Sequence, residues 1–231
     1  MSNLDTLLGE SLAPARVSYD TAEHDWTAWL TARPLPTNAA LDARLADPAT
    51  RAGFVAVCRA QGIYHLPTVE IVSALAHTLK RLPAPWLEVG AGRGDLARAL
   101  RAAGVPITAT DDGAWWPDPL PADVERCAIT DALQRYQPGI ALCVWSPRGT
   151  NWPALFRATP SIRAYLLIGD GPHGMTGNAA SWSGAPGWRR RALPHLAALG
   201  RCRLDAEGNL QTHTLLVRRV VAKSAPRHEA G

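Results

Sequence analysis

Short apolar runs alternate with amphipathic stretches between residues 85 and 221 of the chain. Residues 140–145 are apolar at nearly every position, which is typical of a parallel strand covered on both faces. The same alternation predicts further strands at residues 86–89, 107–110, 126–129 and 164–168, and a helix at 95–103. Strands that alternate with helices predict an α/β fold built on a doubly wound, mostly parallel sheet.

The C-terminal part of the pattern predicts how this sheet ends. Residues 188–199 have helical periodicity, although Pro194 falls within them. Two short segments, 201–204 and 214–220, are separated by a stretch that begins with the polar residues and glycine of 205–209. We therefore expect them to pair as a closing antiparallel hairpin.

Residues 1–84 have a different texture, which is helical and irregular. Asp47 precedes a predicted helix over 49–60, which Gly62 ends, and Pro67 begins another. Apolar residues recur at helical spacing in the second helix, at Val72, Leu75, Leu79 and Leu82. We expect a helical N-terminal segment (1–84) that forms a lid and substrate wall, a main domain (85–221) and a tail (222–231).

Composition limits the class of protein. The chain has 231 residues, of which 47% are hydrophobic and 19% charged, so most of it is expected to fold. No stretch approaches the roughly 20 apolar residues that span a bilayer, and the acidic start does not resemble a secretory signal. Its four cysteines are far apart and form no CxxC pair, which argues against a metal site and against disulfides. A reduced, cytoplasmic enzyme is the expectation.

The basic residues are mainly arginine, and they are scattered along the sequence. The net charge is +4, and only Lys80 and Lys223 among the 24 basic residues are lysines. Nucleic-acid-binding proteins usually present a basic stripe with interleaved aromatic residues, and the one dense run here is 189–191. The sequence therefore predicts neither a nucleic acid nor a membrane as a partner, and it leaves the oligomeric state open.

The strongest chemical signal is a glycine-rich turn between the first predicted strand and its helix. Glu88 lies in the strand, and the turn contains Gly90, Ala91, Gly92 and Gly94. Glycines allow a tight turn and a close approach of the backbone to a ligand, and the helix that follows presents free N–H groups. The next strand ends in a pair of acids, Asp111 and Asp112. A carboxylate at that position can accept both hydrogen bonds of a ribose diol.

This region resembles motif I and the acidic loop of class I S-adenosylmethionine-dependent methyltransferases, whose Rossmann-like fold the chain would then share. The spacing GxGxG differs from the GxGxxG of nicotinamide-binding domains, and Asp95 places a negative charge where a pyrophosphate would lie. The chain is also similar to a little-characterised group within this superfamily. Its shared motifs are found here at residues 64–67, 88–94, 143–147, 168–171 and 176–177, with a different residue order at 144–147.

The resemblance implies a role for each matching residue. The backbone of residues 88–94 would hold the methionine portion of S-adenosylmethionine, with Glu88 near its ammonium. Asp111 would hold the ribose, and Asp112 would line the adenine edge. The remaining implied cofactor contacts are Asp131 to the adenine amine, Trp145 and Ser146 beside the sulfonium, and Tyr64 to the carboxylate. A helix N-cap explains Asp131 equally well.

Methyl transfer requires a general base only when the acceptor is a hydroxyl or a protonated amine. His65 and His173 are the candidates, because both are expected near the ligand edge of the sheet. A packed interface would also explain Tyr64 and His65. Aromatic residues at Trp115 and Trp116 follow the acidic pair and could form a pocket wall.

The expected activity is S-adenosylmethionine-dependent methyl transfer to an oxygen or nitrogen of a small-molecule or peptide acceptor. A nicotinamide-dependent oxidoreductase is one alternative, although the few lysines offer no evident hydride-site pair. A catalytically silent cofactor-binding module that regulates a partner is another. A nucleic-acid methyltransferase is disfavoured by the scattered charge and by the absence of an Asn-Pro-Pro-Tyr-type strand end.

Overall fold

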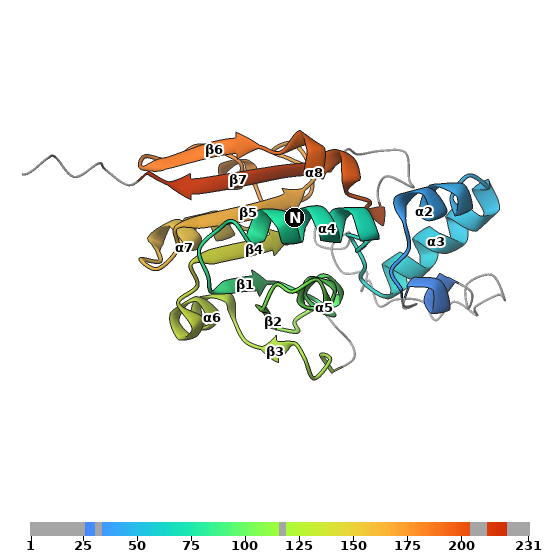
Figure 1. The fold of residues 1–231 in the computed structure, drawn as a ribbon, viewed down its shortest axis with the longest axis horizontal. Helices are drawn as coiled ribbons and strands as arrows, with labels where there is room; N and C mark the ends of the chain where they lie inside the picture. The colour runs from blue at the N-terminus through green and yellow to red at the C-terminus, as the bar shows by residue number, and fades with distance from the viewer. Residues whose placement is uncertain (1–25, 31–33, 116–118, 204–211, 221–231) are drawn as a thin grey trace, which may run out of the picture.

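The computed structural model describes residues 26–30, 34–115, 119–203 and 212–220. A seven-stranded sheet in the order β3-β2-β1-β4-β5-β7-β6 forms its centre (Figure 1). The strands are β1 Trp86–Val89, β2 Ile107–Asp111, β3 Glu125–Arg126, β4 Ile140–Val144, β5 Ala164–Gly169, β6 Trp188–Ala192 and β7 His213–Arg219. Neighbours among β1 to β5 pair in parallel, and β7 runs antiparallel to both β5 and β6. The expected doubly wound, mostly parallel α/β sheet is confirmed.

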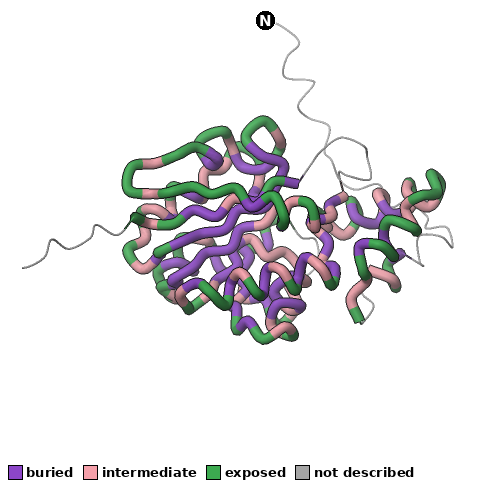
Figure 2. Tube along the Cα trace, turned by 45° about the horizontal axis from the view of Figure 1, so that its top comes forward, coloured by how far each residue is buried: buried purple, intermediate pink, exposed green. Residues whose placement is uncertain are grey.

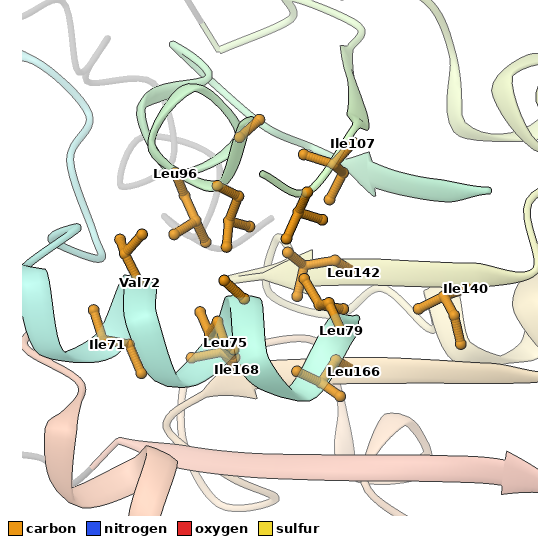
Figure 3. Close-up of a cluster of buried hydrophobic side chains, with 14 of the residues drawn as sticks. Ile71, Val72, Leu75, Leu79, Leu96, Ile107, Ile140, Leu142, Leu166 and Ile168 are labelled. Carbon is orange, nitrogen blue, oxygen red and sulfur yellow. The ribbon is translucent and has the colours of Figure 1, made fainter. Parts of the chain in front are cut away.

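Helices cover both faces of this sheet. One face packs against α4 Val69–Leu79, α5 Asp95–Ala102 and α8 Pro194–Leu199. Figure 3 shows Leu75 and Leu79 of α4 directed at Leu142, Leu166 and Ile168 of the sheet. The other face packs against α6 Ile129–Tyr136 and α7 Trp152–Ala158.

The central strands are buried, as their apolar sequences predict. Every residue of β5 is buried, and so are the first four of β4 (Figure 2). A strand that is covered by helices on both faces has no polar face, so its sequence loses the alternation of a half-exposed strand.

The closing antiparallel pair uses a different strand from the one expected. Trp188–Ala192 is not helical but forms β6, which pairs with β7. The helix α8 begins after it, with Pro194 at its first position, where a missing N–H costs no hydrogen bond. The proposed partner segment 201–204 contributes only an isolated bridge at Cys202 within the described residues; Leu204 lies outside them.

The N-terminal helices α2 Asn38–Arg44 and α3 Pro48–Ala60 lie beyond the carboxyl ends of the parallel strands (Figure 1). Asp47 caps α3, because its carboxylate accepts the Thr50 N–H at 2.7 Å. These helices share a small core of their own that includes Trp26, Leu41 and Phe54. The segment therefore stands over the edge where a doubly wound sheet binds its ligands.

Three sequence predictions fall wholly or partly outside the described ranges. They are the start of the N-terminal segment 1–84, the pocket-wall role of Trp116, and the tail 222–231. Within those ranges, no helix combines the length and the apolar character that crossing a membrane requires. The four cysteines are buried, and none of them forms a disulfide bond. Over the same part of the chain, His, Cys, Asp and Glu side chains nowhere gather in a group of three or more that could hold a metal ion.

Candidate functional site

The glycine-rich turn joins β1 to α5 at the point where the strand order reverses between β1 and β4. Gly90, Gly92 and Gly94 all have left-handed backbones, with φ of 64°, 55° and 71°. A Cβ on Gly90 would lie 2.7 Å from the Trp152 ring, and one on Gly94 would lie 2.4 Å from Val124. Both the turn and its close packing therefore require glycine at these positions.

Asp111 connects this turn to β2. Its buried carboxylate accepts the Gly92 N–H at 2.8 Å and the Gly113 N–H at 2.7 Å. An ionised carboxylate offers about four lone-pair positions, so two are left for a further donor. The sequence-predicted acid and the glycine turn thus form one hydrogen-bonded unit.

Asp112 lies next to this unit but faces solvent. Its carboxylate accepts the Ala114 N–H at 2.9 Å, which stabilises the turn after β2. Trp115, two residues beyond Gly113, is 80% exposed. Trp115 is thus a surface residue, and it does not line a pocket wall in this structure.

Glu88 is buried beneath the turn and lacks a full set of partners. The residue is 3% exposed, and its Oε2 has no hydrogen-bond partner. Burial raises the pKa of Glu88 to about 8, with nearby Asp95 and Asp111 acting in the same direction and Arg101 opposing them. A cationic group above the turn would favour the ionised form.

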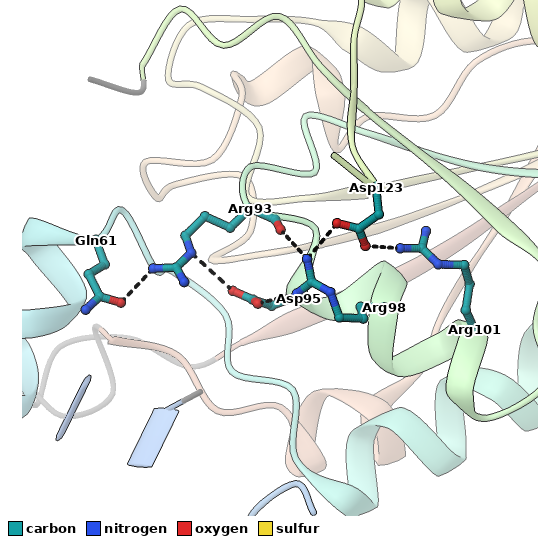
Figure 4. A network of polar contacts seen from close by, with 6 residues as sticks. All are labelled: Gln61, Arg93, Asp95, Arg98, Arg101 and Asp123. Carbon is teal, nitrogen blue, oxygen red and sulfur yellow. Dashed lines mark hydrogen bonds and ion pairs between the residues drawn. The ribbon is translucent and has the colours of Figure 1, made fainter. Parts of the chain in front are cut away.

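A polar network holds the turn and the start of α5 in place. Figure 4 shows its members, which are Gln61, Arg93, Asp95, Arg98, Arg101 and Asp123. Arg98 donates to the Arg93 carbonyl at 3.2 Å and pairs with Asp95 and Asp123, each at 2.8 Å. Arg93 reaches out of the turn and donates to Gln61 at 2.8 Å. Through Gln61, at the end of α3, the N-terminal helices contact the turn directly.

An aromatic pair stands at the carboxyl end of β4. Tyr64 and Trp145 stack with their ring centroids 6.0 Å apart, and the Arg203 guanidinium covers Tyr64 at 4.4 Å. Trp145 has φ of 58°, a left-handed backbone that is rare outside glycine and costs free energy. Its indole Nε1 is buried without a hydrogen-bond partner. Ser146 follows it, is buried, and accepts the Gly177 N–H on its carbonyl at 3.2 Å.

His65 is held beside this pair by its backbone. It forms an antiparallel bridge with Cys202, and the flanking Leu66 N–H donates to the Arg201 carbonyl at 2.9 Å. Both ring nitrogens of His65 are buried and have no hydrogen-bond partner. Burial lowers the pKa of His65 to about 4, so the imidazole is neutral at physiological pH.

The other candidate base, His173, is exposed in the loop after β5. The loop is held together by Asp170, a residue to which sequence reasoning assigned no role. Its buried carboxylate accepts the N–H groups of Met175 and Thr176 at 2.5 and 2.8 Å. The loop therefore folds around Asp170 and leaves His173 at the surface.

Asp131 occupies the first turn of α6 and is exposed. The N-cap of α6 is Ala128, so the alternative prediction that Asp131 caps this helix was wrong. A carboxylate in the first turn still stabilises the helix through its dipole.

The structure thus brings two groups of predicted residues to one edge of the sheet: Glu88, the glycine turn and Asp111 form one, and Tyr64, His65, Trp145 and Ser146 form the other. Asp112, Asp131 and His173 are exposed and belong to neither group. The register places Val89 level with Thr110 on one side and with Cys143 on the other, so the turn, Asp111 and Trp145 follow neighbouring strand ends. Sequence reasoning missed the role of Arg93, a residue of the turn that donates to Gln61, and it missed Trp152, which contacts the turn from outside the motif. No local signal in the sequence indicates that the Trp152 ring lies against Gly90.

The chain matches no protein-family model, and it is similar to no curated protein sequence. It is similar to the solved structure of human N-acetylserotonin methyltransferase in complex with SAM, with 13% identity, a TM-score of 0.42, and coverage of 86% of this chain and 66% of that one. The chain therefore spans just under two thirds of that neighbour's length. It is also similar to Burkholderia thailandensis 1,6-didemethyltoxoflavin-N1-methyltransferase, with 18% identity, a TM-score of 0.37, and coverage of 82% and 93%.

A third similar structure is the 23S rRNA methyltransferase ErmE, with 15% identity, a TM-score of 0.36, and coverage of 71% and 72%. The Pnkp1/Rnl/Hen1 RNA repair complex is similar as well. The expectation that nucleic acid is excluded as a partner is therefore wrong, because similar structures include proteins of RNA metabolism. At these identities and TM-scores the likenesses carry no conclusion about this chain's own activity.

Proposed function

We propose that the chain binds S-adenosylmethionine and transfers its methyl group to an oxygen or nitrogen of an acceptor. The observation that carries the proposal is the hydrogen bond from the Gly92 N–H to Asp111. This bond holds the glycine turn against Asp111, whose carboxylate keeps lone pairs for the two hydroxyls of a ribose. Both lie at the point where the strand order of the sheet reverses. Similar solved structures contain this cofactor or its product, which agrees with the proposal.

The residues present fit this cofactor by their chemistry. The unpartnered oxygen of Glu88 offers a buried acceptor beneath the turn, which suits an ammonium group. Asp111 suits the ribose hydroxyls, while Asp112 and Asp131 are the acids available toward the adenine side. When bound, the cofactor supplies an electrophilic methyl group on a sulfonium.

The chain's own part in the reaction is to position the acceptor and to hold a proton where one is released. Tyr64 and Trp145 form a flat wall at the end of β4, and their stacking orients both rings before an acceptor arrives. His65 is neutral at physiological pH, which a general base must be before the reaction begins. We propose residues 1–84 as the lid and substrate wall, and we keep His173 as a second candidate base because the loop that carries it follows β5.

Calorimetric titration with S-adenosylhomocysteine tests the proposal. We expect wild-type protein to bind and Asp111→Asn to bind about tenfold or more weakly, because charge-assisted hydrogen bonds to the ribose are lost. Asp42→Asn is the matched control, since it neutralises an exposed acid of α2 that pairs with Arg201 outside the candidate site, and it should change the dissociation constant by less than about threefold.

Binding of NAD(H) without binding of S-adenosylhomocysteine would support the oxidoreductase alternative and refute our proposal. Binding of the cofactor without methyl transfer to any small-molecule, peptide or RNA acceptor would favour the regulatory module instead. The cytoplasmic location also stays a prediction, which rests on the wide spacing of the four cysteines in the sequence.

A further inference from the structure

Arginines that are scattered in the sequence come together on the edge ribbon formed by β6 and β7. The strand register places Arg189 directly opposite Arg218, and Arg191 lies two residues along on the same face. All three side chains are exposed. We call Arg189, Arg191 and Arg218 the arginine cluster.

The charge of the arginine cluster is not neutralised within the part of the chain that the structure describes. No acidic side chain there forms an ion pair with any of the three residues. Between residues 132 and 203 the sequence has nine arginines and one acid, Asp170. That acid is buried and accepts hydrogen bonds from its own loop, so it does not offset the cluster.

Like charges placed directly opposite each other on a sheet destabilise the pairing of the strands, so the facing pair Arg189 and Arg218 is unfavourable for folding. The neighbouring basic residues on the other face of the ribbon do have partners. Arg190 donates to the Trp182 carbonyl, and Arg219 covers the Trp188 ring at 4.9 Å and donates to the Thr159 carbonyl at 3.0 Å. The contrast indicates that the arginine cluster is left available for a partner that carries negative charge.

We propose that the arginine cluster binds the phosphate backbone of a nucleic acid. Successive side chains on one face of a strand are about 7 Å apart, and opposite ones about 5 Å. The cluster therefore offers several separate cations along an open surface, which suits a chain of phosphates. Guanidinium groups match phosphate oxygens in a two-pronged geometry, which lysines do not.

An anionic membrane fits the surface less well. Membrane-surface binding combines basic residues with a set of exposed apolar side chains. Of the large hydrophobic residues that are exposed in the described ranges, only Val220 adjoins β7; the others are Tyr64, Val69, Trp115 and Met175.

The position of the cluster also indicates how long the bound polymer must be to reach the candidate site. Arg218 is level with Ala164, at the opposite end of β5 from the loops of that site. Strand rise and spacing place the cluster roughly 20 Å from the end of β1. A single phosphate or nucleotide could not touch both places, whereas an oligonucleotide could. The inference does not require methyl transfer, because backbone binding can be measured alone.

Fluorescence anisotropy with a labelled, mixed-sequence, single-stranded RNA of 20 nucleotides tests the proposal at a series of KCl concentrations. We expect Arg189→Gln/Arg218→Gln to bind at least about tenfold more weakly than wild type. The slope of log Kd against log [KCl] should fall by about one to one and a half, because two phosphate contacts are lost. Arg191→Gln alone should give about half that change in slope.

Arg81→Gln is the matched control, since Arg81 is an exposed arginine just beyond α4 and outside the cluster. It should bind RNA as wild type does. Equal binding by the cluster variants and wild type, or an equal loss in Arg81→Gln, would overturn the proposal. Circular dichroism spectra confirm that each variant is folded.

Three further probes separate the possible partners. DNA of the same sequence, bound with the same dependence on the cluster, supports a backbone contact. Phosphatidylserine vesicles bound in a cluster-dependent way, without RNA binding, would assign the surface to a membrane and overturn the proposal. Polyglutamate bound as tightly as RNA would overturn it in favour of an acidic protein.

Discussion

Gly94 illustrates two separate reasons why a residue must be glycine. Its backbone has φ of 71°, and an added Cβ would lie 2.4 Å from Val124. We expect Gly94→Ala to lower the free energy of unfolding by about 2 to 5 kcal/mol, because left-handed strain adds to overpacking. Denaturant unfolding monitored by circular dichroism measures the change.

Gly149 separates the two effects. It has φ of 83°, and an added Cβ would meet nothing within 4 Å. Gly149→Ala should therefore cost only the strain, about 1 to 2 kcal/mol. Equal losses in the two variants would show that the contact with Val124 contributes nothing.

Glu88 makes stability depend on pH. The pKa of Glu88 is raised to about 8 in the folded protein, from 4.5 for an ordinary glutamate. The folded state then binds more protons than the unfolded state between these values. The contribution of Glu88 to stability is complete below about pH 4.5 and is lost as the pH rises through 8.

We therefore expect Glu88→Gln, which stays neutral, to become more stable relative to wild type as the pH rises from 5 to 8. The difference should grow by up to about 1.4 kcal/mol per pH unit. Thermal and denaturant unfolding across this range measures it, with Asp112→Asn as an exposed-acid control. A pH profile of Glu88→Gln that is parallel to that of wild type would contradict the assigned pKa.

At the level of elements, the pairing of β6 with β7 sets two arginines against each other. We expect Arg218→Gln to raise the free energy of unfolding by about 0.2 to 1 kcal/mol, because like charges opposite each other are unfavourable. The gain should shrink at high salt, where exposed charges are screened. Unfolding at low and high KCl measures it, and no gain at low salt would show that the two side chains avoid each other.

The elements differ in how well the sequence predicts them. β1 has the predicted bounds, Trp86–Val89, because a buried apolar run followed by glycine is a local signal. β6 was predicted as a helix. Its pairing with β7 depends on residues far along the chain, and three successive arginines give no alternation. α7 was missed because seven residues are too few to show a clear helical periodicity.

The candidate site shows the same division. The glycine turn and Asp111 lie within a short stretch of chain, and their contact follows from parallel pairing of β1 with β2. The contacts of Tyr64 with Trp145 and Arg203 join segments that are distant in sequence. No local pattern predicts which of many aromatic residues will meet in that way.

At the level of the whole molecule, one hydrogen bond couples the N-terminal helices to the turn. Arg93 donates to Gln61 at 2.8 Å. A double-mutant cycle of Arg93→Ala and Gln61→Ala should give a coupling free energy of about 0.5 to 1.5 kcal/mol, measured by unfolding. Arg93→Ala combined with the distant Arg218→Gln should be additive. Additivity of the first pair as well would mean that the bond does not couple the two parts.

The backbone bridge between His65 and Cys202 has a consequence for how the protein is made. The Arg203 N–H donates to the Tyr64 carbonyl at 3.0 Å, beside the bond from Leu66 to Arg201. A nascent chain therefore carries Tyr64 long before residues 201–203, and it cannot anchor Tyr64 until those residues have left the ribosome. The wall formed by Tyr64 and Trp145 is completed only after all five parallel strands of the sheet have been synthesised.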